Sequence, residues 1–97
     1  MATYVVLAHF TEQGIKHIAD TLKRSEALKA TAKKIGVTMK EQYWTLGAYD
    51  IVAIFEAPDD EAMTTLGMSL GKLGNVRTQT LRAFTAAELK GILGKVA

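Results

Sequence analysis

Two strand-like runs of the chain are separated by only three residues, and this spacing constrains the fold more than any other feature. The runs are Val37–Thr45 and Tyr49–Ala57, with Leu46-Gly47-Ala48 between them. A loop this short that contains glycine is typical of a hairpin joining two antiparallel strands. The second run is almost entirely apolar, which predicts a central strand. The first run is mixed in polarity and fits an edge strand.

The N-terminal part of the chain predicts one more strand and a long helix. Tyr4–Phe10 is apolar on both faces and reads as a second central strand. A helix is expected from about Gln13 to Lys34. Its apolar stripe changes phase around Lys23-Arg24-Ser25-Glu26, so we expect an irregularity there, with Ser25 as a second N-cap. Gly36 suits a left-handed helix end.

The C-terminal part predicts a second helix, a fourth strand and a third helix. Pro58 and the three acids that follow it open the second helix. Asn75–Phe84 alternates in polarity and predicts another edge strand. Thr85-Ala86-Ala87-Glu88 is a capping-box pattern that starts a C-terminal helix. Three glycines of the second helix predict close packing against the sheet, with the last as its cap: Gly67, Gly71 and Gly74.

This order of elements predicts a ferredoxin-like α+β fold, βαββαβ, with an added C-terminal helix. Right-handed crossovers then give an antiparallel four-stranded sheet with the first and third strands in the middle and the helices on one face. On the other face, Val52 and Ile54 would lie bare, flanked by Asp50 and Glu56. We expect a second copy to cover this face, which would make a dimeric α/β barrel rather than a monomer.

Length and composition limit the classes of protein. The 97 residues fit one domain spanning residues 1–97. A net charge of +2 with scattered lysines argues against a nucleic-acid partner. The chain has no cysteine, which excludes disulfides and thiol catalysis. We see no signal peptide and no apolar stretch of the roughly 18 residues that a membrane span needs, so we expect a cytoplasmic protein without a membrane partner.

Four polar or aromatic residues are candidates for a ligand pocket. With a three-residue hairpin loop, strand alternation sends Glu41, Tyr43 and Tyr49 to the helix-facing side of the sheet, near His9 at the end of its strand. Together they would line a pocket for a small molecule, or they would form a rim of the core with satisfied polar tips. His9 would serve as a base or as a haem or metal ligand, or simply as a hydrogen-bonded residue at a strand end.

Trp44, Asp50 and Arg82 complete the candidate ligand-binding residues. The same register puts Trp44 opposite Asp50. Asp50 and Glu56 are roughly 20 Å apart along a strand, too far for a general acid–base pair within one chain. The alternative is that each acid bonds a basic side chain or a partner chain. The two histidines lack the spacing of a metal motif, so no metal site is predicted, and no cofactor is indicated.

The sequence resembles the GYD domain family over essentially its whole length. The resemblance rests on Phe10–Gly14, Tyr43–Asp50, Glu56–Glu61 and Gly74–Phe84, and the Gly-x-Tyr-Asp signature stands here as Gly47-Ala48-Tyr49-Asp50. It implies a ferredoxin-like α/β domain that oligomerises. The family brings no established biochemical activity.

Three functions compete at this point. The leading one is a small homo-oligomeric domain that binds a small molecule or acts as an accessory module. The alternative is a cofactor-poor enzyme similar to antibiotic-biosynthesis monooxygenases, haem-degrading enzymes or muconolactone isomerase, in which His9, Tyr49 and Trp44 would matter most. The third is a structural subunit of a larger assembly.

Overall fold

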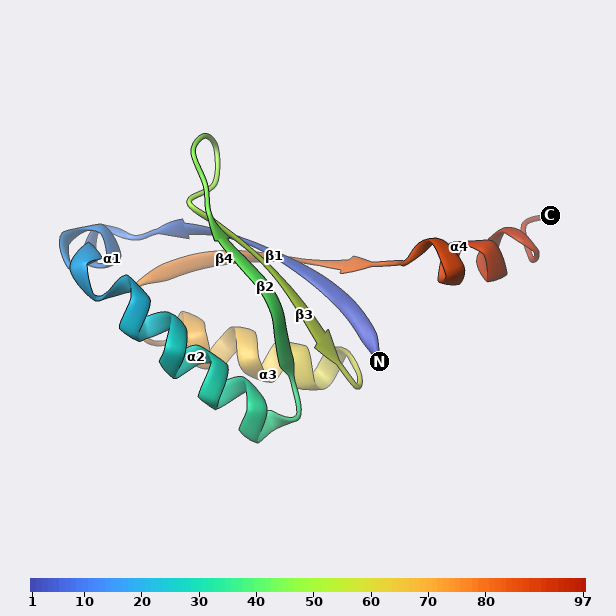
Figure 1. Ribbon diagram of the computed structural model, residues 1–97, viewed down its shortest axis with the longest axis horizontal. Coiled ribbons are helices and arrows are strands. Elements are labelled where there is room, and N and C mark those ends of the chain that lie inside the picture. The colour runs from blue at the N-terminus through green and yellow to red at the C-terminus, as the bar shows by residue number, and fades with distance from the viewer.

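The chain folds, in a computed structural model of residues 1–97, into a four-stranded antiparallel sheet with two long helices packed on one face and a C-terminal helix that projects away (Figure 1). This confirms the predicted ferredoxin-like α+β fold with an added C-terminal helix. The strands are β1 (Ala2–Phe10), β2 (Thr38–Trp44), β3 (Ile51–Ala57) and β4 (Val76–Ala83); the helices are α1 (Glu12–Lys16), the 3-10 turn η1 (Ile18–Asp20), α2 (Thr21–Ile35), α3 (Asp60–Gly71) and α4 (Ala86–Leu93).

The strand order is β2-β3-β1-β4, so the two most apolar strands lie in the middle, as predicted. The core fills the space between the sheet and helices α2 and α3. Val6 of β1 and Phe55 of β3 point into it, and Leu66 of α3 meets them from the helix side; all three are buried. Gly36 ends α2 with a φ of 87°, the left-handed cap expected there.

The break in the first helical segment lies closer to the N-terminus than predicted. Helix α1 ends at Lys16, and the chain turns through η1 before α2 begins. The carbonyl groups freed at this break need donors, and the Arg24 guanidinium supplies them by bonding the oxygens of His17 (2.9 Å) and Gly14 (3.3 Å). Ser25 is not a second N-cap: it lies buried inside α2, where its hydroxyl bonds Gln42.

The glycines of α3 do not pack closely on the sheet, which corrects our prediction. A Cβ added at Gly67 or Gly71 would meet no heavy atom within 4 Å, because both lie beside the buried stripe of Met63 and Leu66 rather than within it. Gly74 has a φ of 81°, the left-handed conformation expected of it, but the helix already ends at Gly71.

The close approach occurs instead at Gly14. A Cβ there would lie 2.0 Å from the backbone oxygen of Asn75. We expect Gly14→Ala to lower the free energy of unfolding by about 2 kcal/mol or more, because backbone must move. In contrast, Gly67→Ala should raise it by up to about 1 kcal/mol, since alanine favours the helix. Urea unfolding of both variants measures this; equal effects at the two positions would contradict the close packing at Gly14.

The β2–β3 hairpin exists, but its register differs by one residue from the predicted one. Thr45 donates its N–H to the oxygen of Asp50 (2.8 Å), so the loop is longer than three residues and Trp44 lies opposite Ile51 instead of Asp50. A register shift of one residue sends every side chain to the other face. The predicted register also puts Lys40 opposite Ile54, whereas the strand has a bulge between Met39 and Glu41, with Lys40 as the extra residue and Glu41 opposite Ile54.

Candidate functional site

The sheet face that carries no helix presents an apolar patch, which we call the open face. Val5 of β1 lies opposite Ile54 on one side and Leu81 on the other, and Leu7 lies opposite Val52. These side chains sit on the middle of the sheet, yet none of them is buried. The prediction that Val52 and Ile54 share an uncovered face is confirmed within the single chain.

Glu41 and Tyr43 also lie on the open face, contrary to the expected helix-facing position. The shifted register puts Glu41 opposite Ile54 and Tyr43 opposite Val52. The Tyr43 hydroxyl donates to the Glu41 carboxylate (3.0 Å), and this bond raises the pKa of Tyr43. The pair forms one edge of the open face, over β2.

His9 and Tyr49 meet at the end of the open face nearest the hairpin. Their ring centroids are 4.7 Å apart, and the Tyr49 hydroxyl donates to Gln79 (3.3 Å). His9 is exposed and lies opposite Arg77 in the sheet. Tyr49 was expected on the helix side, but it belongs to the loop before β3, so strand alternation does not govern its direction.

Asp50 holds the end of β1 in place. Its carboxylate accepts the Phe10 N–H (2.9 Å), and its own N–H donates to the oxygen of Ala8 (2.9 Å). The aspartate of the Gly-x-Tyr-Asp signature thus links the hairpin to the end of β1 through hydrogen bonds to the β1 backbone. Glu56 is separate and pairs with Lys40 at 3.6 Å, one of the basic partners that the sequence allowed for it.

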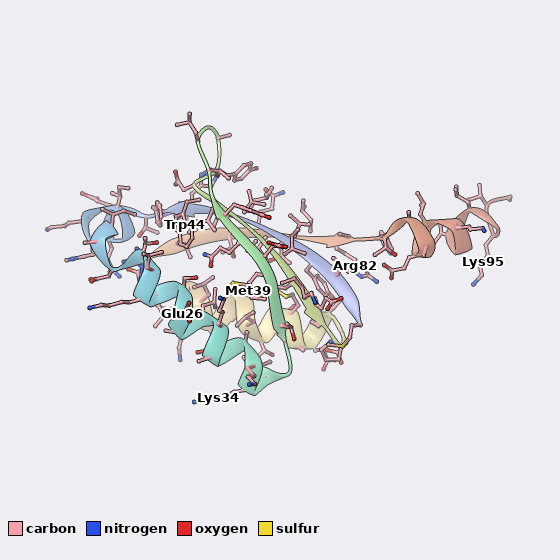
Figure 2. All side chains as sticks on the ribbon, viewed as in Figure 1. Glu26, Lys34, Met39, Trp44, Arg82 and Lys95 are labelled. Carbon is pink, nitrogen blue, oxygen red and sulfur yellow. The ribbon has the colours of Figure 1, made fainter.

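Trp44 and Arg82 lie on the helix side of the sheet, at opposite edges (Figure 2). The Trp44 indole N–H donates to the Thr21 hydroxyl (3.1 Å). The Arg82 guanidinium carbon lies 4.4 Å from the ring centroid of Phe84 and 5.7 Å from that of Tyr4. The seven candidate residues therefore do not surround one site. In particular, Trp44 lies on the face opposite to His9 and Tyr49, with which the enzyme alternative grouped it.

Tyr4 is a buried phenol that the sequence pattern shows only as part of a strand. Its hydroxyl donates to the carboxylate of Asp60 in the first turn of α3, which ties β1 to that helix. This hydrogen bond, with burial second, raises the pKa of Tyr4 above its ordinary value of 10.0. The one signal in the sequence is a tyrosine within an apolar strand, a position where a partner for the hydroxyl is required.

The raised pKa of Tyr4 gives a pH dependence with a defined sign. Because the folded state favours the neutral phenol, the bond stabilises the protein fully below pH 10.0 and loses its effect as the pH rises through the folded-state pKa. At pH 7 we expect Tyr4→Phe to cost about 1 kcal/mol. The difference in the free energy of unfolding between wild type and variant should become smaller above pH 10. Chemical unfolding at both pH values tests this; a constant difference would rule out the coupling.

Helix α4 is a second uncovered apolar surface. It projects away from the sheet and the other helices, with Lys95 far from the body (Figures 1 and 2), and none of its residues is buried. Its start is well formed: Thr85 and Glu88 make the predicted capping box, and the Thr85 backbone amide lowers the pKa of Glu88. The apolar side chains at helical neighbour spacing are all more than 40% exposed: Leu89, Ile92, Leu93 and Val96.

Metal-binding clusters and membrane-spanning helices are both missing from the structure. No group of three His, Asp or Glu side chains is placed to hold a metal ion. None of the helices combines the length and the apolar character that crossing a bilayer would require.

Comparison with known proteins gives the family. The family model for the GYD domain matches residues 4–93. The chain belongs to the GYD domain family. Among curated proteins, the "Glutamine synthetase and cystathionine beta-lyase binding protein" of Thermus thermophilus is 32% identical to this GYD protein over 90 residues, covering 92% of this chain and 95% of the relative.

Solved structures agree on the fold. FFRP-DM1 has a TM-score of 0.63 at 20% identity and covers 87% of this chain and all of its own. TTHA0845 from Thermus thermophilus has a TM-score of 0.58 at 28% identity, with coverage of 89% and 96%. A hypothetical protein, PHS023 from Pyrococcus horikoshii, has a TM-score of 0.62 at 20% identity, with coverage of 88% and 92%.

Proposed function

We propose that this GYD protein is a homo-oligomeric accessory module that binds a metabolic enzyme. The observation that carries the proposal is that the single chain leaves two apolar surfaces uncovered, the open face and α4. Large exposed apolar surfaces mark sites of protein association. We propose that such a chain works as a part of an assembly in the cytoplasm.

A second copy is the best occupant of the open face. Two-fold pairing places the same surface on both subunits, so the surface must match itself. The apolar centre around Val5 and Ile54 meets this condition, because aliphatic side chains pack against one another without a preferred partner. Glu41 lies on the edge strand β2, level with Val5, and Arg77 lies on the other edge strand β4, level with His9. A two-fold pair can therefore set each acid against the base of the other copy.

Helix α4 adds apolar surface to that of the open face. A stable interface buries about 800 Å² of accessible surface on each partner, so this added surface favours a stable pair. An isolated helix of this length is also marginal in water. We infer that α4 packs its stripe of Leu89, Ile92 and Leu93 on the second copy, which both enlarges the interface and stabilises the helix.

The enzyme partner is proposed from the curated relative. That protein is named for binding glutamine synthetase and cystathionine β-lyase, and the two chains match over nearly their full lengths. The binding role fits a chain in which Tyr43, Asp50 and Glu56, three of the groups that could do chemistry, are bonded within the fold. We therefore propose that an enzyme of one of these two classes is the partner.

The proposal is tested with the purified full chain and the two enzymes from the same organism. In sedimentation velocity, we expect the chain to move with glutamine synthetase or cystathionine β-lyase when it is in molar excess, and not with an unrelated enzyme of similar mass. If the GYD protein does not sediment together with either enzyme, the proposed partner is wrong. The self-association is measured separately, on the chain alone, so the two parts of the proposal can fail independently.

A further inference from the structure

A small apolar cavity lies on the side of the sheet opposite to the open face, under α2 and α3. Its volume is about 150 Å³. The small side chains of Ala8 and Ala53 on the sheet leave this space between the layers, and Leu28 of α2 and Leu70 of α3 line it from the helix side, where it is partly open to solvent. A largely apolar pocket with a few polar groups at one place is the usual form of a small-molecule site.

The volume and the apolar lining of the cavity indicate which kind of chemical group it can hold. A space of about 150 Å³ is large enough for benzene. Most of the lining residues are apolar, and two of the polar ones, Ser25 and Gln42, bond each other, so water would find few partners inside. The cavity therefore suits one aromatic ring or a branched aliphatic group of similar volume.

Arg24 indicates that the ligand carries a negative charge at one end. Its half-buried side chain lines the cavity, and its guanidinium bonds two backbone oxygens, those of His17 and Gly14. The ion pairs of the protein involve other side chains, so this positive charge has no carboxylate partner. A guanidinium has five N–H donors, and two bonds to carbonyls leave others free for an anion.

We propose that the cavity binds a small monocarboxylic acid with an aromatic or branched aliphatic body, the body in the apolar space and the carboxylate at Arg24. This site goes beyond the proposed accessory function and does not depend on it, because the cavity and the open face lie on opposite sides of the sheet. A ligand that binds only the folded chain would also stabilise the fold.

The test compares benzoate with benzyl alcohol, which has a similar body and no charge. Amide chemical shifts of the full chain are followed by NMR in titrations with each compound. We expect shifts around Val6, Leu28 and Leu70, with benzoate bound at least about tenfold more tightly than the alcohol, a difference in keeping with one charge-assisted hydrogen bond. No shifts at millimolar benzoate, or equal affinity for both compounds, would overturn the proposal.

Three variants assign the roles. Arg24→Gln should lower the affinity for benzoate at least about tenfold and leave benzyl alcohol unchanged, while Arg24→Lys, which keeps the charge, should restore part of the preference. Ala53→Leu should fill the space and weaken both compounds, and Lys34→Gln at an exposed position of α2 is the matched control with no effect. If Arg24→Gln binds benzoate like wild type, the carboxylate assignment is wrong. If Arg24→Gln does not fold, Arg24→Lys and Ala53→Leu still decide the outcome.

Discussion

Val5→Glu is expected to turn the self-associated protein into a monomer with a mass close to 10.5 kDa. Val5 lies at the centre of the open face, between Ile54 and Leu81. In the assembly its side chain would be enclosed by apolar groups of both copies, where an unpaired carboxylate costs several kcal/mol. Each 1.4 kcal/mol weakens association tenfold, so a loss of about 100-fold or more is expected.

The fold itself should survive this substitution, because the open face carries no part of the chain's own core. Light scattering after size exclusion gives the mass, and far-UV circular dichroism reports the fold. Ala30→Glu introduces the same charge on an exposed position of α2 and should leave the mass unchanged. A Val5→Glu protein that stays folded and associated would show that the open face is not the assembly surface.

Ile92→Ser is expected to weaken self-association by about ten- to a hundredfold. Ile92 lies in the apolar stripe of α4, which is uncovered in the single chain. Burying an isoleucine side chain is worth about 1.5–3 kcal/mol, and this contribution disappears with serine. The matched variant Ala87→Ser changes a residue on the other side of the same helix and should have little effect.

A dilution series followed by sedimentation velocity gives the dissociation constants of these variants. Deletion of residues 86–97 extends the test, since α4 forms no part of the core and its removal should leave the sheet folded. A deletion variant that associates as strongly as wild type would exclude the second copy as the partner of α4. The helix would then be free for another partner, and the apolar stripe would belong to the enzyme-binding surface.

The architecture was predictable because each element carries a local signal. The apolar sequences of β1 and β3 predict central strands, and the mixed polarity of β2 and β4 predicts edge strands. The capping box at Thr85 and Glu88 marks the start of α4, and Gly36 marks the end of α2. These features depend on neighbouring residues alone, which is why the sequence shows them.

The register was not predictable, because it depends on the length of a loop. Gly47 indicates a turn, and its φ of 120° confirms the need for glycine, but the turn extends to Asp50 through a backbone bond at Thr45. That shift by one residue moved Tyr43 and Glu41 to the open face. The bend before α2 was misplaced for a related reason: it depends on Arg24 reaching back to carbonyls, which periodicity does not show.

The candidate site was predictable only in part. The uncovered face around Val52 and Ile54 followed from the strand pattern, while the cavity beside Arg24 arises where small side chains of the sheet face α2 and α3. The roles of His9, Tyr49 and the other candidate ligand-binding residues stay predictions. Their positions divide them between two faces, so any ligand that uses all of them would have to contact more than one copy of the chain.

We propose that this chain functions only as part of an assembly. Sedimentation equilibrium of the unmodified protein at micromolar concentration tests this proposal, because the method gives mass without assumptions about shape. We expect an integral multiple of 10.5 kDa, beginning with the dimer. A mass of 10.5 kDa throughout the concentration range would contradict it, since the open face and α4 would then be exposed to water in the working protein.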